Sequence, residues 1–230
     1  MELEVDQVYC MDALELMARL PDNSVDLCFA DPPYNNGTAY ANYIDQRSDY
    51  RDWCASWFAQ CERISKYIVI TPGHGNLWMW GEIKTPKGVG IWYKPGNPYS
   101  SVMGYEEYEP WIYYAKSFIP LGGSTVIKST ISQQKLIGNH PCPKPLTFMY
   151  KLIKKLLPID NGLVLDPFSG TGTTLIAARA LGHRFIGSDT SPEYCEIARE
   201  RLKTEFASRK QKPGESLDDL PLFRAAGEGE

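Results

Sequence analysis

A strand, a glycine-rich turn and a helix follow one another from Leu163 to about Leu181. The apolar run Leu163–Leu165 is typical of a buried strand, Gly170 and Gly172 permit a tight turn, and helical spacing follows. In such a unit the free N–H groups of the helix face the turn, so the carboxyl end of the strand becomes a ligand site. A chain built on this unit is expected to form a parallel sheet with helices on both faces.

The rest of the chain favours the same fold class, because short apolar runs alternate with amphipathic segments. Further strands are predicted at Val5–Cys10, Val25–Ala30, Tyr67–Thr71, Val89–Tyr93, Trp111–Tyr114 and Phe185–Ser188. Further helices are predicted at Ala13–Leu20, from Ser48 to about Ile64, from Pro145 to about Pro158, and from Pro192 to about Phe206. We therefore expect an α/β protein with a mostly parallel, doubly wound sheet.

Length and composition limit the possible domain organisation. A chain of 230 residues corresponds to one domain, or one domain with a small insert. We place a main domain at residues 1–207, a weakly patterned insert at about 117–139, and a flexible tail rich in Gly, Pro and acidic residues at 208–230. No apolar run approaches the ~18 residues that span a bilayer, and the acidic start lacks a signal peptide's pattern. These features predict a cytoplasmic protein.

The six cysteines do not indicate a metal site. No two of them form a CxxC pair, and no His/Cys cluster has the spacing of zinc ligands. In the cytosol they are expected to be reduced thiols that pack as small hydrophobic side chains. We therefore predict no bound metal.

The net charge of −4 is concentrated in the tail. Residues 213–230 hold five acidic residues and one basic residue, so the remainder, with 23 of each, is neutral. Within that neutral part, residues 110–159 contain seven lysines and no Asp or Glu. Either one face of the fold is positive enough to meet a polyanion, or these lysines are simply solvated.

The acidic residues around the glycine turn narrow the choice of ligand. Asp189 lies at the end of the next strand, 19 residues past Gly170, where a carboxylate accepts hydrogen bonds from ribose hydroxyls. Leu175 stands where a dinucleotide fingerprint has its third glycine, and no lysine follows Gly172 as a P-loop requires. Asp166 would repel a pyrophosphate but attract an ammonium group. The pattern favours S-adenosylmethionine, which carries an ammonium group and a ribose but no phosphate; the alternative is a purely structural turn.

A second motif, Asp31-Pro32-Pro33-Tyr34, follows the strand predicted at Val25–Ala30. Two prolines fix the backbone and remove two hydrogen-bond donors. The carboxylate and the aromatic ring suit a planar ring that bears an exocyclic amino group. One N–H would be accepted by Asp31 and the other by the Pro32 carbonyl, which turns the nitrogen lone pair toward an electrophile. Taken alone, such a tetrapeptide is more commonly a rigid turn after a strand.

Together the two motifs resemble those of the amino-group DNA methyltransferases, which modify N6 of adenine or N4 of cytosine. Their order, with the tetrapeptide first and the glycine turn late, is similar to the beta class, a circular permutation of the common methyltransferase chain. The segment His140-Pro141-Cys142-Pro143-Lys144-Pro145 also resembles that class, although Asp189 stands where many members carry Glu. The resemblance covers most of residues 5–206. It implies a Rossmann-like, S-adenosylmethionine-dependent enzyme that methylates a flipped base.

The resemblance also assigns roles to individual residues. Catalysis is expected from Asp31, Pro32, Pro33 and Tyr34. Contacts with the cofactor are expected from Asp12, Ala13, His140, Lys144, Asp166, Pro167, Phe168, Gly170, Gly172, Thr173 and Asp189. In this class Asp at the first tetrapeptide position usually accompanies adenine, so N6 of adenine is the expected target. The alternatives are N4 of cytosine and a non-catalytic DNA-binding module, whereas Leu175 disfavours a nicotinamide oxidoreductase.

The expected partner is DNA. The base-reading region of the class falls on the short insert, where Lys128, Gln133 and Lys135 are expected to contact DNA. The alternative for this insert is an ordinary surface loop. So short a region is also compatible with a homodimer. Residues 35–46 are either a lid over the target pocket or a disordered connection. The tail segment Leu220–Phe223 is faintly similar to peptides that bind bacterial sliding clamps, and the absence of a nuclease motif fits a solitary bacterial or phage-borne enzyme.

Overall fold

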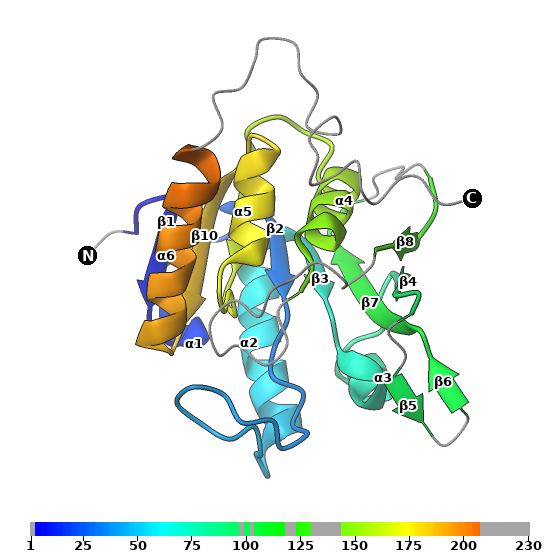
Figure 1. Cartoon of the computed structure of the whole chain (residues 1–230). Helices are drawn as coiled ribbons and strands as arrows, with labels where there is room; N and C mark the ends of the chain where they lie inside the picture. The colour runs from blue at the N-terminus through cyan, green and yellow to red at the C-terminus, as the bar shows by residue number, and fades with distance from the viewer. Residues whose placement is uncertain (1–2, 97–98, 102–103, 118–122, 130–143, 208–230) are drawn as a thin grey trace.

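The computed structural model describes residues 3–96, 99–101, 104–117, 123–129 and 144–207 (Figure 1). Its strands are β1 (Gln7–Cys10), β2 (Val25–Ala30), β3 (Ser65–Ile70), β4 (Gly88–Tyr93), β5 (Tyr99–Ser101), β6 (Gly104–Glu106), β7 (Tyr108–Ala115), β8 (Val126–Lys128), β9 (Leu163–Asp166) and β10 (Arg184–Asp189). Its helices are α1 (Ala13–Ala18), α2 (Tyr50–Ile64), α3 (Gly73–Ile83), α4 (Leu146–Leu156), α5 (Thr173–Ala180) and α6 (Pro192–Ala207).

Most of these strands form one mostly parallel sheet. The sheet is eight-stranded, with the order β1-β10-β9-β2-β3-β7-β4-β8, while β5 and β6 form a separate two-stranded ribbon. Strand β7 runs antiparallel to β3 and to β4, and the other pairings described in the large sheet are parallel. The predicted fold class is therefore confirmed.

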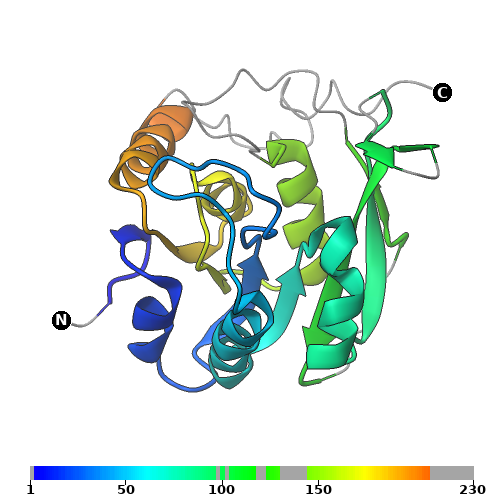
Figure 2. The same cartoon turned by 90° about the horizontal axis from the view of Figure 1, so that it is seen from below.

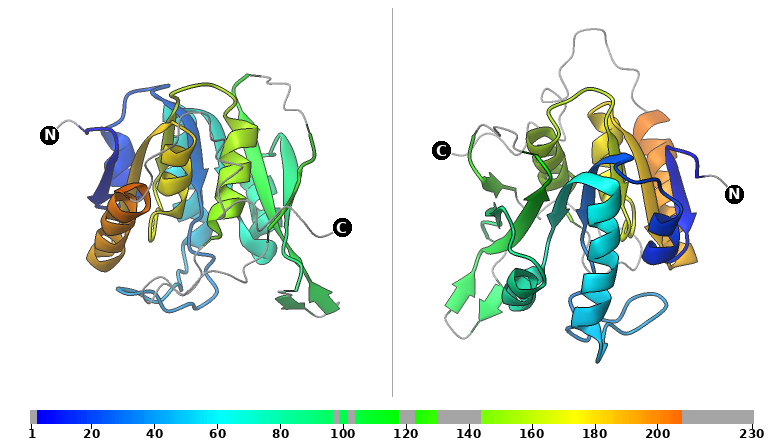
Figure 3. Two further views of the ribbon diagram at one scale, coloured as in Figure 1. Left: turned by 45° about the horizontal axis from the view of Figure 1, so that its top comes forward. Right: turned by 180° about the vertical axis from the view of Figure 1, so that it is seen from behind.

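Helices cover both faces of the sheet. Helices α4, α5 and α6 lie on one face and α1, α2 and α3 on the other (Figure 3). Strand β2 shows how the sequence produces this arrangement: Leu27 and Phe29 join the core under the first group, and Cys28 and Ala30 join the core under the second. Because both faces are buried, such a strand appears in the sequence as a continuous apolar run.

Helix α3 and three short strands, β5, β6 and β8, were not predicted from the sequence. Helix α3 has no apolar stripe, since Trp80 is fully buried while Trp78 is 81% exposed, and so it lacks the usual periodic signal. The strands of the β5–β6 ribbon have three residues each, which is too short for an alternating pattern to be read. Strand β8 also has only three residues and lies within the weakly patterned insert. In the described part of the chain, no helix has the length and apolar character needed to cross a membrane.

The order of the strands brings four acidic residues to one edge of the sheet. Asp166 and Asp189 end β9 and β10, Asp31 directly follows β2, and Asp12 lies two residues after the end of β1. These strands are neighbours and parallel, so their carboxyl ends meet. Open α/β sheets bind their ligands at this edge. The loop between β2 and α2 crosses the view from below in Figure 2.

Candidate active site

A cavity of about 530 Å³ lies at the carboxyl edge, within the size range of small-molecule sites. The predicted residues that line it are Asp12, Ala13, Asp31, Pro32, Pro33, Tyr34, Lys144, Asp166, Pro167, Phe168, Gly170, Thr173 and Asp189. Gly172 and Lys128 are not among the lining residues. Gln133, Lys135, His140 and the tail lie outside the described residues, as does most of the insert. The two motifs, more than a hundred residues apart, thus share one cavity.

The glycine turn requires glycine for two separate reasons. Gly170 and Gly172 have φ of 48° and 83°, in the left-handed region that other residues avoid. In addition, a Cβ atom on Gly172 would lie 2.8 Å from the Cβ of Ala198 on α6. Gly172 therefore lets α5 begin close against α6, which is a packing role, whereas Gly170 faces the cavity.

Asp166 is a buried acid at the centre of the cavity wall. Only 2% of the residue is exposed, and its carboxylate accepts a hydrogen bond of 3.0 Å from the Phe168 N–H. Burial raises the pKa of Asp166 to about 7, and the charges of Asp31 and Asp189 add to the effect. A cation placed beside it would relieve this cost.

Two further acids line the cavity while they organise the backbone. Asp189 accepts hydrogen bonds from the Gly170 N–H at 3.1 Å and the Ser191 N–H at 2.8 Å, and burial raises its pKa. Asp12 caps helix α1 and accepts a hydrogen bond of 2.8 Å from the Leu14 N–H. A carboxylate has about four lone-pair sites, so each retains acceptor capacity toward a ligand.

The Asp31 carboxylate is held by one of its two oxygens. Thr71, which follows β3, and Tyr34 donate to Oδ1 through their hydroxyls, and the Lys144 ammonium donates to the same oxygen at 2.9 Å. Among the described residues, no hydrogen bond ends at Oδ2. The side chain is 21% exposed and lines the cavity. Asp31 is therefore oriented by the protein with one oxygen left to accept a donor.

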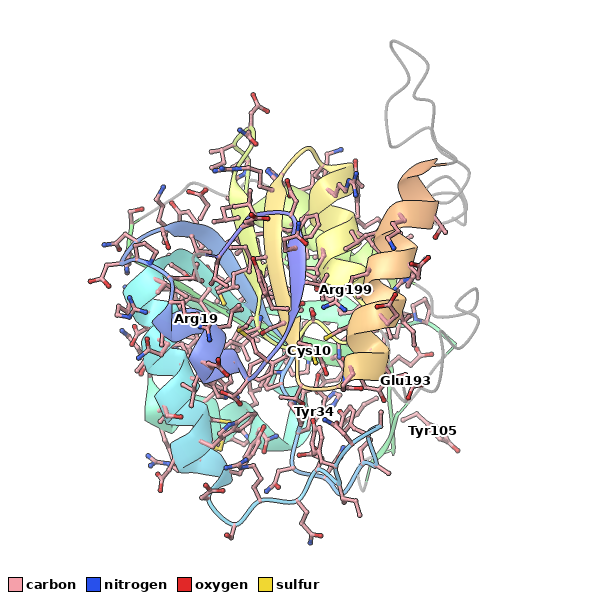
Figure 4. The ribbon with its side chains drawn as sticks, turned by 90° about the vertical axis from the view of Figure 1, so that its left-hand side faces the viewer. Cys10, Arg19, Tyr34, Tyr105, Glu193 and Arg199 are labelled. Atoms are coloured by element: carbon pink, nitrogen blue, oxygen red, sulfur yellow. The ribbon has the colours of Figure 1, made fainter. Side chains whose placement is uncertain are left out.

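Tyr34 is part of the same arrangement. Its hydroxyl lies 2.7 Å from Asp31 Oδ1 and 3.0 Å from Lys144 Nζ, and burial raises its pKa, so the hydroxyl stays protonated and donates. Gly73, at the start of α3, packs against the ring so closely that a Cβ there would lie 3.0 Å from the ring carbon Cδ2. Figure 4 shows Tyr34 at the end of the molecule crossed by the loop between β2 and α2.

Lys144 reaches the Asp31–Tyr34 tetrapeptide. We expected it at the cofactor, and the structure places its ammonium against Asp31 and Tyr34. Two charged residues that we did not predict, Lys94 and Glu109, lie next to it. In the sequence, Lys94 directly follows one predicted strand and Glu109 shortly precedes another, and the stretch between them resembles the family only weakly.

The loop of residues 35–47 is ordered as a cover over the cavity. Asp45 is only 2% exposed and accepts a hydrogen bond from the Asn35 N–H at 2.6 Å, which ties the two ends of the loop together. At the tip, the Ala41 N–H donates to the Tyr194 hydroxyl at 3.2 Å, and Asn42 donates to Thr190 at 3.3 Å. The loop thus runs from β2 along the cavity to the start of α6.

Lys128 lies apart from the cavity, at the exposed end of β8. The Lys151 ammonium, on α4, donates to the Lys128 carbonyl at 3.1 Å. Burial lowers the pKa of Lys151, and the charge of Lys128 adds to this. The acid-free stretch therefore brings two lysines together on the surface formed by α4 and β8.

Known proteins share this architecture. The family model described as DNA methylase matches residues 78–200. The type II methyltransferase M2.MboI of Moraxella bovis is 30% identical over 254 residues, which cover 89% of this chain and 93% of that protein. The DNA adenine methyltransferase YhdJ of Escherichia coli (strain K12) is 28% identical over 238 residues, covering 83% and 80%. Among solved structures, the M1.HpyAVI–SAM complex superposes with a TM-score of 0.63 at 25% identity, covering 85% of this chain and 98% of that one.

These similarities extend well beyond the glycine turn. The family match runs from α3 to α6 and so includes Lys94, Glu109 and Lys144, and it covers more than half of the chain. The match to M2.MboI covers nearly the full length of both proteins. The chain belongs to the N6/N4 DNA methylase family, whose members are S-adenosylmethionine-dependent enzymes.

Proposed function

We propose that this protein transfers a methyl group from S-adenosylmethionine to the exocyclic amino group of a base in DNA, and that the target is N6 of adenine. The observation that carries the proposal is the Asp31 carboxylate, with Oδ1 held by three donors and Oδ2 without a hydrogen bond among the described residues. Asp at this position favours adenine in the family that the motif resembles, and the relative YhdJ is named a DNA adenine methyltransferase.

The cavity residues fit the charges of the cofactor. When bound, S-adenosylmethionine would supply a methyl group on a sulfonium, whose carbon–sulfur bond breaks so that a neutral thioether leaves. Asp166 would bind the ammonium, because its raised pKa marks a buried acid that lacks a compensating cation. Asp189 would accept hydrogen bonds from the ribose, and Asp12 would contact the adenine ring. Phe168 lines the cavity and packs edge-on against Trp53 and Trp57, which fixes an apolar wall.

The tetrapeptide orients and then deprotonates the target amine. Asp31 Oδ2 accepts one N–H of the amino group and the Pro32 carbonyl accepts the other, so the nitrogen lone pair points toward the methyl donor. As the nitrogen forms its new bond to carbon it gains positive charge, and its proton passes to the Asp31 carboxylate. The protein contributes positioning and electrostatic stabilisation, which supply much of the rate enhancement in many enzymes. The Tyr34 ring would stack on the flipped base.

The lid and the lysine surface would complete the substrate complex. Residues 35–47 close over the cavity and exclude water from the reacting groups. Lys128, on the α4–β8 surface, would bind a DNA phosphate and position the duplex. Residues 1–207 would form the catalytic domain, with the short insert as its base-reading region.

Product identification tests the proposal. The purified protein is incubated with unmethylated bacterial DNA and labelled S-adenosylmethionine, and the digested nucleosides are identified by mass spectrometry. N6-methyladenine is the expected product. N4-methylcytosine would overturn the choice of base while keeping the site, and no labelled nucleoside on duplex or single strands would favour the non-catalytic module. The control is Asp31→Asn, which is expected to bind the cofactor with unchanged affinity but to form no product.

A further inference from the structure

Two further charged residues, Glu109 and Lys94, lie next to the Lys144–Asp31 ion pair. Glu109 is near the beginning of β7, and Lys94 follows the end of β4. Because β7 runs antiparallel to β3 and β4, its beginning lies at the edge where those two strands end. The register pairs Glu109 with Trp92, and so places it beside Lys94 at the active edge. Neither charged residue lines the cavity.

The distances form a chain of ion pairs that ends at Asp31. Glu109 Oε1 lies 2.8 Å from Lys94 Nζ, and Glu109 Oε2 lies 3.6 Å from Lys144 Nζ. Lys144 in turn donates to Asp31 at 2.9 Å. The side chains of Lys94, Glu109 and Lys144 are 8%, 20% and 10% exposed. Two acids and two bases thus balance one another in a region where a single unpaired charge would be costly.

Lys144 is shared between two carboxylates. Burial acts to raise the pKa of Glu109, but the charges of Lys144 and Lys94 lower it, so Glu109 carries a full negative charge at neutral pH. Its Oε2 atom is buried and has no hydrogen-bond partner among the described residues, so it meets Lys144 only as an ion pair. The ammonium of Lys144 thus lies between the two carboxylates, at 2.9 Å from Asp31 and 3.6 Å from Glu109.

We propose that Glu109 is a positioning residue for methyl transfer, which acts through Lys144 to keep the Asp31 carboxylate oriented and able to accept the amino proton. The inference rests on the proposed function and names a residue that supports it. Without the charge on Glu109, Lys144 would interact more strongly with Asp31 and weaken Asp31 as an acceptor. The site would also gain a net positive charge beside the amine nitrogen, which itself becomes positive as it bonds to the methyl group, and this opposes the reaction.

A double-mutant cycle tests this chain of action. Glu109→Gln keeps the size of the side chain and a partner for Lys94, so the fold is expected to persist. It should lower kcat on DNA about tenfold, with the Kd for S-adenosylmethionine changed less than about twofold. Glu109→Asp, which keeps the charge, should recover part of kcat. In a Lys144→Met background, Glu109→Gln should lower kcat less than about twofold further, because the residue through which it acts is gone.

A neighbouring carboxylate provides the matched control. Glu107 accepts a hydrogen bond from the Gly96 N–H at 2.9 Å and is not part of the ion-pair chain, so Glu107→Gln should retain wild-type kcat. An unchanged kcat in Glu109→Gln would overturn the inference. It would also be overturned if Glu109→Gln lowered kcat by the same factor in the Lys144→Met background as in the wild type. A lower melting temperature with normal kcat per folded molecule would assign Glu109 a purely structural role and also overturn it. A wild-type protein that methylates no DNA would overturn both this inference and the proposed function.

Discussion

At the scale of single residues, Tyr34 combines two roles that substitutions can separate. Its hydroxyl donates to Asp31, and its ring offers a stacking surface. Tyr34→Phe removes only the hydroxyl, and a hydrogen bond to a charged group contributes roughly 1.5–3 kcal/mol, so kcat should fall by about tenfold or more with the KM for DNA little changed. Tyr34→Ala removes the ring as well and should also raise the KM. Steady-state kinetics distinguish the two variants.

The cofactor should bind equally well to both Tyr34 variants, because Tyr34 contacts Asp31 and Lys144 rather than the acids of the glycine turn. Calorimetric titration with S-adenosylmethionine checks this expectation. A comparable loss of cofactor affinity in both variants would mean that Tyr34 supports the cofactor and not the target base.

Asp166 makes cofactor binding depend on pH. With its pKa near 7 in the free protein, the carboxylate is mostly protonated at pH 6 and mostly ionised at pH 8. Only the ionised form attracts the ammonium, so the Kd for S-adenosylmethionine should be about tenfold lower at pH 8 than at pH 6. Calorimetric titration at the two pH values measures the ratio. A Kd that does not vary between pH 6 and pH 8 would remove Asp166 from the ammonium site.

The matched control is Asp166→Asn, whose side-chain oxygen can still accept the Phe168 N–H. Its cofactor binding should be weak at both pH values.

The raised pKa of Asp166 also affects stability. Ionising a buried acid whose pKa lies above its unfolded value destabilises the fold as pH rises from about 4 toward 7, and the loss persists at higher pH. Asp166→Asn should therefore melt at a higher temperature than the wild type at pH 8 without cofactor.

At the scale of elements, the start of helix α3 determines where the Tyr34 ring lies. Gly73 has φ of 68°, and an added Cβ would lie 3.0–3.3 Å from three ring atoms of Tyr34. Gly73→Ala should therefore destabilise the protein by about 1 kcal/mol or more and lower kcat by displacing the ring. Gly75, in the same helix, has open space around its Cα, so Gly75→Ala should leave kcat unchanged and slightly raise stability. Thermal melts and kinetics of the pair compare the two positions directly.

Equal losses at the two glycines would show that the contact with Tyr34 does not explain the loss at Gly73. The same element shows why a local pattern can miss a helix. A helix with one fully buried tryptophan and another 81% exposed has no stripe to detect. It meets Tyr34 through the close approach of Gly73 to the ring and through Asn76, whose amide donates to the Tyr34 carbonyl at 2.9 Å.

The lid is a second element whose state the sequence left open. Polar loops of this composition can be ordered or disordered, because the outcome depends on partners elsewhere in the chain. Here Tyr194 and Thr190, about 150 residues further along, supply those partners. Within the loop, Asp45 accepts a hydrogen bond from the Asn35 N–H and so holds its two ends together.

At the scale of the whole molecule, the lysines of the acid-free stretch predict how DNA binding responds to salt. Lys128 is exposed at the edge of the sheet, beside Lys151. If Lys128 binds one phosphate, Lys128→Gln should weaken DNA binding for all sequences and reduce the slope of log K against log salt by about 1. Fluorescence anisotropy at several salt concentrations measures the slope.

Lys66 is the matched control for Lys128. It lies near the beginning of β3, at the side of the sheet opposite the carboxyl ends of the parallel strands, and pairs with Asp26 at 2.7 Å. Lys66→Gln should leave the salt slope at its wild-type value. A Lys128→Gln slope identical to that of Lys66→Gln would place the DNA on another surface.

The sequence by itself determined the fold class, the two motifs, the cofactor and the family, because each of these is written in short stretches of neighbouring residues. A buried strand, a glycine turn and a helix need only about a dozen residues to be visible, and Asp31-Pro32-Pro33-Tyr34 is contiguous. The preferred backbone conformation and the pattern of buried residues depend on residues close together in the sequence, so both can be read from a short segment.

Only the tertiary structure decided which side chains meet Asp31. Lys144 reaches it from 113 residues away, and Thr71 from 40. Glu109 and Lys94 join them because β7 runs antiparallel to its neighbours, a direction that no local pattern specifies. Strand order and direction are set by how whole elements bury their apolar faces against one another, so contacts that depend on them appear only once the sheet is assembled.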